Sequence, residues 1–242
     1  MKPFLLLSIR AEPAAADDEH AAFARFLGVE RADLPRIQLG VEPLDVSLDD
    51  WSGILLGGGS FTYSDDVAAK SPAQQRAEAD LWGLLDRVVA ADFPFLGACY
   101  GIGTLGSHQG GLIDRSHPEP VGPLSVTLTD AGADDPLFAG LPRDFAAYGG
   151  HKEALTVLPG HAVRLATSVA CPVQAFRVGA NVYATQFHPE LDLAGIETRI
   201  ETYATYGYFA PEESGALRAA SRAVAVSHPM TILGNFARRY AR

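Results

Sequence analysis

Three residues of types that carry out nucleophilic catalysis lie in two short motifs far apart in the chain. Cys99 stands in the motif GACYG, residues 97–101, directly after the apolar run Phe93–Leu96. Small residues on both sides of a nucleophile are typical of a nucleophile elbow, a tight turn from strand to helix that forces the central side chain outward. The free N–H groups at the start of the following helix favour a thiolate. The pattern therefore predicts a nucleophile at Cys99; a buried core cysteine is the alternative.

The second motif is QFHPE, residues 186–190, which follows the alternating strand pattern of Val182–Gln186. A cysteine nucleophile needs a base that takes its proton and returns it to the leaving group, and a third group that orients the base. His188 and Glu190 supply these two groups. A strand-terminating turn explains the motif by itself, but the occurrence of both motifs in one chain favours a catalytic set of Cys99, His188 and Glu190.

Together the two motifs resemble those of the class I (triad) glutamine amidotransferases, most closely free-standing domains similar to the amidotransferase half of GMP synthase. The resemblance extends roughly from Leu5 to Tyr208. Three further segments agree with it. GILLGGGS (53–60) resembles the strand and loop that supply an oxyanion-hole amide, YGGHKE (148–153) a histidine-bearing segment beside the site, and SVACPVQAF (168–176) the strand pair before the catalytic histidine.

The resemblance implies that Cys99 attacks the side-chain amide of glutamine, giving a γ-glutamyl thioester and ammonia, and that water then releases glutamate. It implies oxyanion-hole N–H donors at Tyr100 and Gly58, and substrate-binding residues at Gly57, Gly59, Gly103, His151 and Gln186. We expect the loop glycines to permit close backbone approach and positive φ. A plain strand-to-helix loop is the alternative for Gly57–Gly59. A phosphate-binding role is weaker, because no Lys-Ser/Thr pair follows.

One departure from the family pattern concerns substrate choice. Gly103 stands where the family commonly has a glutamine that helps hold the amino-acid end of the substrate. The leading hypothesis is a stand-alone amidotransferase-type hydrolase whose ammonia is used by a separate synthetase chain. A γ-glutamyl peptidase or hydrolase without ammonia transfer is the second hypothesis, and Gly103 favours it slightly. A catalytically silent binding or regulatory protein is the third, although the complete set of catalytic residue types speaks against it.

Composition limits the class of protein. The chain has 242 residues, 48% of them hydrophobic, and a formal net charge of −10, which argues against a nucleic-acid surface. The apolar run Phe4–Ile9 is too short to span a membrane and predicts a first buried strand, while Ala14–Ala16 leave a signal peptide open. With two cysteines, and Cys171 expected to be buried and inert, the usage fits a reducing, cytoplasmic location. The scattered histidines suggest no metal site, and no cofactor is expected.

Apolar strands alternate with helical patterns in the first half of the chain, and short strands dominate after Leu124. We therefore expect an α/β fold: one domain over residues 1–242 with an open, mostly parallel sheet flanked by helices and a small antiparallel extension. The resemblance makes this fold flavodoxin-like. Residues 211–242 form a C-terminal helical extension that either packs on the core or supports a homo-oligomer. A solvated helix face is expected for Arg199 and Glu201, with a position near the active site as the alternative. Predicted strands are 4–9, 54–56, 93–96, 124–128, 145–148, 154–158, 163–166, 173–178 and 182–186, and predicted helices are 18–27, 72–91, 212–225 and 229–240.

Overall fold

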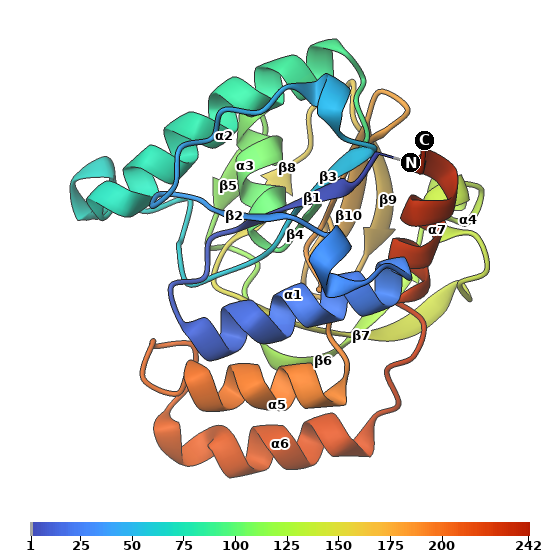
Figure 1. Ribbon diagram of the computed structural model, residues 1–242. Coiled ribbons are helices and arrows are strands. Elements are labelled where there is room, and N and C mark those ends of the chain that lie inside the picture. The colour runs from blue at the N-terminus through green and yellow to red at the C-terminus, as the bar shows by residue number, and fades with distance from the viewer. Residues whose placement is uncertain (1) are drawn as a thin grey trace.

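A nine-stranded sheet runs through the computed structural model, which describes residues 2–242 (Figure 1). The strand order is β2-β1-β3-β4-β11-β10-β9-β6-β7. The first five strands in this order are parallel, and the remaining four continue the sheet in antiparallel fashion. Their bounds are β1 Phe4–Ser8, β2 Arg36–Gln38, β3 Gly53–Leu56, β4 Phe95–Ala98, β6 Glu119–Leu128, β7 Asp144–His151, β9 Val163–Thr167, β10 Ala175–Val178 and β11 Val182–Thr185. A separate two-stranded sheet pairs β5 (Leu112–Asp114) with β8 (Ala154–Val157).

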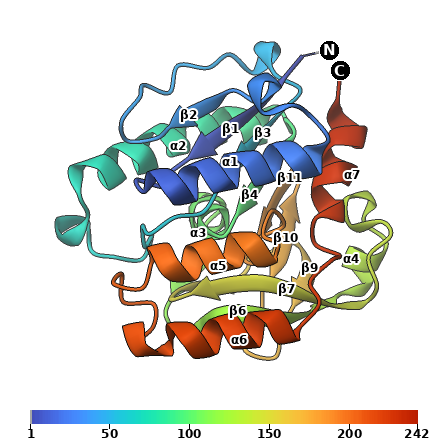
Figure 2. The ribbon, with the colours of Figure 1, turned by 60° about the horizontal axis from the view of Figure 1, so that its bottom comes forward.

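Helices cover both faces of the parallel part. On one face, α1 (Pro13–Leu27) and α7 (Thr231–Tyr240) enclose an apolar cluster with β1, β4 and β11, and on the other, α2 (Pro72–Ala90) and α3 (Tyr100–His108) enclose a second one. The helix α5 (Leu193–Thr202) packs against α1 and against α6 (Ser214–Ala223), as Figure 2 shows. Shorter elements are α4 (Asp130–Ala133) and single 3₁₀ turns at 31–33, 48–50, 67–69, 136–138 and 211–213.

The local sequence explains the two long helices. Ser71 caps α2 by accepting a hydrogen bond from the backbone N–H of Gln74, and Pro72 occupies the first helical position, where its missing N–H costs nothing. The helix α1 also begins at a proline and ends at Gly28, whose φ of 76° is the left-handed conformation that glycine adopts most readily. The pattern of buried residues then fixes which helical face meets the sheet.

The C-terminal helices have different environments. Ile232, Leu233 and Phe236 of α7 are fully buried in the cluster that contains β1 and α1. By contrast, α6 joins a smaller cluster in which Leu217 packs against Tyr148, Ile196 and other residues. In the described residues, α7 is thus part of the main core, whereas α6 covers the region around α5.

The expected fold class is confirmed, and the observed antiparallel part comprises four strands of the main sheet plus the β5–β8 pair. The helix expected from Asp18 begins at Pro13 instead, because five residues rich in alanine precede the apolar positions used for the expectation. The solvated position expected for Arg199 is wrong, since its exposed fraction is only 5%. The described helices include none with both the length and the apolar character needed to cross a membrane.

Candidate functional site

Cys99 occupies the turn between β4 and α3 in a strained backbone conformation. Its φ is 53° and its ψ is −86°, a region that non-glycine residues rarely adopt. The turn is tight because Gly97 and Gly101 touch: a Cβ added to Gly97 would lie 2.8 Å from the Cα of Gly101. A hydrogen bond of 2.7 Å from the Cys99 N–H to the carbonyl of Thr185 ties the turn to β11. These features are those of a nucleophile elbow, with the backbone of Tyr100 starting the helix directly behind the sulfur.

His188 and Glu190 follow β11, the strand next to β4. The His188 N–H donates to the carbonyl of Tyr148 on β7 over 3.0 Å, which fixes the backbone of the turn. The Nδ1 atom of His188 lies 2.7 Å from Oε1 of Glu190, and both side chains are buried. This leaves Nε2 as the ring nitrogen available to the sulfur of Cys99.

The charges of His188 and Glu190 stabilise each other. Burial by itself lowers the pKa of His188, but the Glu190 carboxylate and the neighbouring Cys99 outweigh it and raise the pKa to about 9. Burial likewise opposes ionisation of Glu190, yet His188, with Arg199 and Arg10 beyond it, lowers the pKa of Glu190. An imidazolium held by an ionised carboxylate is the form that can give a proton to a leaving group.

The glycine-rich loop after β3 lies against His188 and Cys99. A Cβ added to Gly58 would be 2.6 Å from Cε1 of His188 and 3.2 Å from Cβ of Cys99, so only glycine fits here. Added Cβ atoms at Gly57 and Gly59 would collide with Glu19 and Ile9. The expected positive φ is not observed at any of the three, and the glycines are required for close approach alone.

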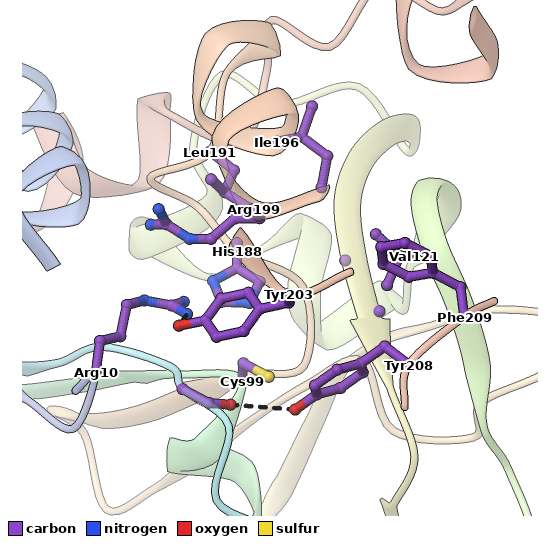
Figure 3. Close-up of a pocket in the computed structure, with 13 residues that line it drawn as sticks. Arg10, Cys99, Val121, His188, Leu191, Ile196, Arg199, Tyr203, Tyr208 and Phe209 are labelled. Carbon is purple, nitrogen blue, oxygen red and sulfur yellow. Dashed lines mark hydrogen bonds between the residues drawn. The ribbon is translucent and has the colours of Figure 1, made fainter. Parts of the chain in front are cut away.

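Two cavities meet at Cys99. The first is lined by Tyr100, Gly103, His151 and Gln186, among others, and has a volume of about 20 Å³. The second, shown in Figure 3, is lined by His188 among others and has a volume of about 50 Å³. Gly59, Gly150 and Tyr208 line both cavities. The sulfur of Cys99 therefore has space on two sides, and His188 lines only the second cavity.

The residues expected to bind substrate fall into two groups. Gly59, Gly103, His151 and Gln186 line the cavity that contains Tyr100, whereas Gly57 lines neither cavity and faces Glu19. The Oε1 atom of Gln186 is buried and has no hydrogen-bond partner among the described residues, so it is open to a ligand. His151 is not open in this way, because its Nδ1 meets the carbonyl of Glu153 and its Nε2 meets Glu119.

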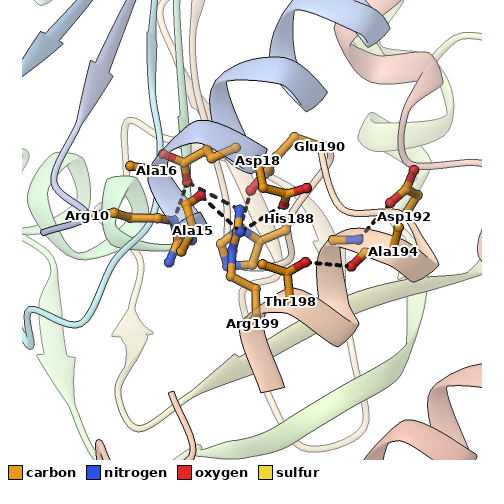
Figure 4. A network of polar contacts seen from close by, with 12 residues as sticks. Arg10, Ala15, Ala16, Asp18, His188, Glu190, Asp192, Ala194, Thr198 and Arg199 are labelled. Atoms are coloured by element: carbon orange, nitrogen blue, oxygen red, sulfur yellow. Dashed lines mark hydrogen bonds and ion pairs between the residues drawn. The ribbon is translucent and has the colours of Figure 1, made fainter. Parts of the chain in front are cut away.

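A buried ionic network lies behind His188 and Glu190 (Figure 4). Arg10 donates from Nε to Glu19 over 2.7 Å, and Arg199 donates from Nη1 to Asp18 over 3.0 Å. The Nη2 atom of Arg199 is 4.0 Å from Glu19. The two cations come from the loop after β1 and from α5, and their charges favour the ionised form of the buried Glu190 carboxylate.

Comparison with known proteins agrees with this geometry. The sequence model of the family described as "Glutamine amidotransferase class-I" matches residues 36–201, more than half of the chain. The chain belongs to the class-I glutamine amidotransferase family. The matched range contains the Cys99 elbow, the glycine-rich loop and the turn of His188 and Glu190.

Several members of this family are similar to the chain. One subunit of the glutamine-hydrolyzing GMP synthase of Thermoplasma volcanium is 30% identical over 164 residues, which are 64% of this chain and 74% of the relative. The glutamine-hydrolyzing GMP synthase of Exiguobacterium sibiricum is 27% identical over 143 residues, and the match spans only 24% of its length. A crystal structure of a glutamine amidotransferase from Thermotoga maritima shares the fold, with a TM-score of 0.77, 20% identity and 99% coverage of both chains.

The departure from the family motif at Gly103 has a structural counterpart. A Cβ added to Gly103 would lie 3.1 Å from Cβ of Tyr63 and 3.5 Å from Oε1 of Glu153. Glu153 in turn accepts hydrogen bonds of 2.7 Å from the backbone N–H groups of Tyr63 and Ser64. Tyr63 and Glu153 therefore lie beside the point from which a glutamine side chain at position 103 would extend.

Sequence reasoning missed the residues outside the motifs that lie near Cys99, His188 and Glu190. Arg10, Glu19 and Tyr208 are of this kind, and Glu153 lies inside a quoted motif but was given no role. A charged residue directly after the first buried strand, as Arg10 is, was the available signal, because the carboxyl ends of parallel strands face the ligand site. Tyr208, whose hydroxyl donates to the carbonyl of Gly59 over 3.3 Å, carried no such signal.

Proposed function

We propose that this chain hydrolyses the γ-amide bond of glutamine or of a related γ-glutamyl compound through a thioester on Cys99. The observation that carries the proposal is the buried pair of His188 and Glu190, 2.7 Å apart, set beside a cysteine in a strained elbow. A structural cysteine needs neither a positive φ nor a histidine whose pKa is raised to about 9. The family membership supports the amide of glutamine as the substrate class.

The proposed reaction has two steps. The thiolate of Cys99 attacks the γ-carbonyl carbon, and the backbone N–H groups of Gly58 and Tyr100 stabilise the oxyanion. The C–N bond then breaks, and its nitrogen leaves with a proton from the imidazolium of His188. Water attacks the thioester and gives a proton to His188, which releases glutamate and restores the thiolate. Glu190 keeps the imidazole oriented throughout.

Two accompanying proposals concern the ammonia and the location. Several relatives of this chain are named as one subunit of a glutamine-hydrolyzing GMP synthase, and we propose that ammonia released here is used by a separate synthetase chain. Both cysteines are free, which fits the reducing compartment of a cytoplasmic enzyme.

A γ-glutamyl peptidase or hydrolase without ammonia transfer is the second candidate. The observation that favours it is Gly103, which stands where the family pattern has a glutamine, with Tyr63 packed beside it: a Cβ added to Gly103 would lie 3.1 Å from Cβ of Tyr63. We infer that the amino-acid end of the substrate is held differently from the family pattern.

The test is glutamate release from L-glutamine and, separately, from a panel of γ-glutamyl peptides and amides. Wild type and Cys171→Ser are expected to be active, and Cys99→Ser inactive. Cys171 is the matched control, because it is fully buried and burial raises its pKa to about 12, which keeps it a thiol. Glutamate release that persists in Cys99→Ser contradicts the mechanism. No release from any compound in the panel favours the non-catalytic alternative.

A further inference from the structure

The cavity on the His188 side of Cys99 is larger than ammonia requires. Its apolar walls are formed by Val121, Leu191, Ile196 and Phe209, and its polar walls by Arg10, Arg199 and Tyr203 (Figure 3). Its volume of about 50 Å³ exceeds the roughly 10–15 Å³ that one water-sized molecule needs. Ammonia is a single polar heavy atom and gains nothing from an apolar wall.

The direction of the reaction assigns this cavity to the leaving group. The nitrogen that departs from the γ-carbonyl must take its proton from His188, so it must face that ring. His188 lines this cavity and does not line the one that contains Gly103 and Gln186. The substituent on the departing nitrogen therefore extends into the cavity bounded by Arg10 and Ile196, while the γ-glutamyl part lies on the other side of the sulfur.

Arg10 places a charged donor in this cavity. Its exposed fraction is 4%, its Nε donates to Glu19 over 2.7 Å, and its Nη1 donates to the hydroxyl of Tyr203 over 2.9 Å. Burial opposes the charge, but Glu19 and Tyr203 raise the pKa of Arg10, so it stays a cation.

The third nitrogen of the same guanidinium is open. Nη2 of Arg10 has no hydrogen-bond partner within residues 2–242, and it lies 3.2 Å from the position of a Cβ added to Gly58. Buried polar groups are normally paired, and a buried cation with a free donor beside a reactive centre points to an acceptor supplied by a ligand.

We propose that this cavity binds a small amino acid as the leaving group, with its carboxylate accepting hydrogen bonds from Nη2 of Arg10. The substrate class is then a γ-glutamyl dipeptide, cleaved into glutamate and a free amino acid. The inference rests on the proposed Cys99 chemistry and specifies the substrate of the second candidate, the γ-glutamyl peptidase. In the reaction, the γ-carbonyl C–N bond breaks, the amino-acid nitrogen takes the proton of His188, and water supplies the oxygen of the new carboxylate. The apolar wall receives the side chain of the amino acid.

The direct test compares three substrates of the wild-type enzyme by kcat/KM for glutamate release. They are γ-glutamyl-alanine, γ-glutamyl-isopropylamide, which has a methyl group in place of the alanine carboxylate, and L-glutamine. We expect γ-glutamyl-alanine to exceed the isopropylamide by about 10-fold or more, the size of effect typical of a hydrogen bond to a charged group. We also expect γ-glutamyl-alanine to exceed glutamine.

A variant pair tests the assigned residue. Arg10→Met together with Glu19→Gln removes the cation without leaving its buried anionic partner unpaired. In this double variant we expect the ratio of kcat/KM for γ-glutamyl-alanine to kcat/KM for γ-glutamyl-isopropylamide to fall toward one. The matched control is Arg143→Met with Asp130→Asn, which removes an ion pair of 2.8 Å between exposed side chains. We expect the ratio of the control to equal that of the wild type, with folding of all variants verified by thermal unfolding.

The outcomes separate the two proposals. If glutamine is hydrolysed but γ-glutamyl-alanine is cleaved no better than the isopropylamide, the leaving-group assignment is overturned and the proposed function stands. If the ratio survives in the Arg10 and Glu19 double variant, Arg10 does not bind the carboxylate and the assignment is equally overturned. If none of the three substrates releases glutamate, both proposals fail.

Discussion

The replacement of Gly58 by alanine tests the packing of the glycine-rich loop against His188, the proposed catalytic base. The added Cβ would lie 2.6 Å from Cε1 of His188, and ordinary van der Waals contact begins at 3.4 Å. The loop and the imidazole must therefore separate by about 0.8 Å, the difference between these two distances. The same methyl group would be 3.2 Å from both Cβ of Cys99 and Nη2 of Arg10, which closes the directions in which the loop could relax.

A displacement of this size has a calculable effect on turnover. Misplacing a catalytic group by about 1 Å can cost on the order of 10²-fold in rate, which corresponds to about 2.7 kcal/mol of transition-state stabilisation. We expect Gly58→Ala to lower kcat/KM by about this factor, measured as glutamate release from whichever γ-glutamyl substrate the wild type prefers. Crowding in a packed region typically costs about 1–3 kcal/mol of folding free energy, so thermal unfolding is followed in parallel.

Gly83→Ala is the matched control. Gly83 lies inside α2, and an added Cβ there has nothing within 4 Å. Because alanine favours the helix interior, we expect full activity and a gain of about 0.5–1 kcal/mol in the free energy of unfolding. If Gly58→Ala keeps more than a third of the wild-type activity while folded, the close approach of the loop to His188 is not needed for catalysis and the reasoning fails.

Four further predictions address charge, pH dependence, specificity and the core. Glu190→Gln removes the carboxylate that helps raise the pKa of His188 to about 9. The alkaline limb of the kcat/KM profile should therefore move to lower pH, and turnover should fall by about 10³–10⁴-fold. An alkaline limb that does not move contradicts the assignment of the raised His188 pKa to Glu190. In the wild type, the proton that His188 binds stabilises the folded state, because folding raises the pKa of His188 from about 6.5 to about 9. This contribution is complete below about pH 6.5 and should disappear as the pH rises through about 9, which thermal unfolding as a function of pH measures. Gly103→Gln should lower glutamine turnover because the added side chain would crowd Tyr63, and increased turnover would refute this. Phe236→Ala should cost about 3–5 kcal/mol in denaturant unfolding, since α7 belongs to the main core, and a loss below about 1 kcal/mol would show that it does not.

The sequence was sufficient for the fold class because most of its strands have a clear apolar pattern. The strands β1, β3 and β4 consist almost entirely of buried apolar residues, and α2 carries a serine cap, an N-terminal proline and a regular apolar face. The short strands β2 and β5 were not predicted. Arg36–Gln38 is only half-buried and Leu112 is exposed, so neither segment has the apolar pattern from which a strand is recognised.

The site was predictable to the extent that chemistry resides in local motifs. The elbow and the turn at His188 each occupy a few consecutive residues, and the parallel order of β3, β4 and β11 brings them to one edge of the sheet. The buried position of Arg199 was not predictable in this way. It depends on the contact of α5 with α1, where Asp18 and Glu19 meet the guanidinium, and the sequence alone favoured a solvated helix face for that residue.

The most direct test of the central claim is to trap the thioester. The wild type and Cys171→Ser are mixed with saturating substrate, quenched in acid during turnover and analysed by intact mass and peptide mapping. The account predicts one added γ-glutamyl group in both proteins, located on the peptide that contains Cys99 and removed by hydroxylamine, and no adduct on Cys99→Ser. An adduct on Cys171, or turnover by Cys99→Ser, would contradict the assignment of Cys99 as the nucleophile.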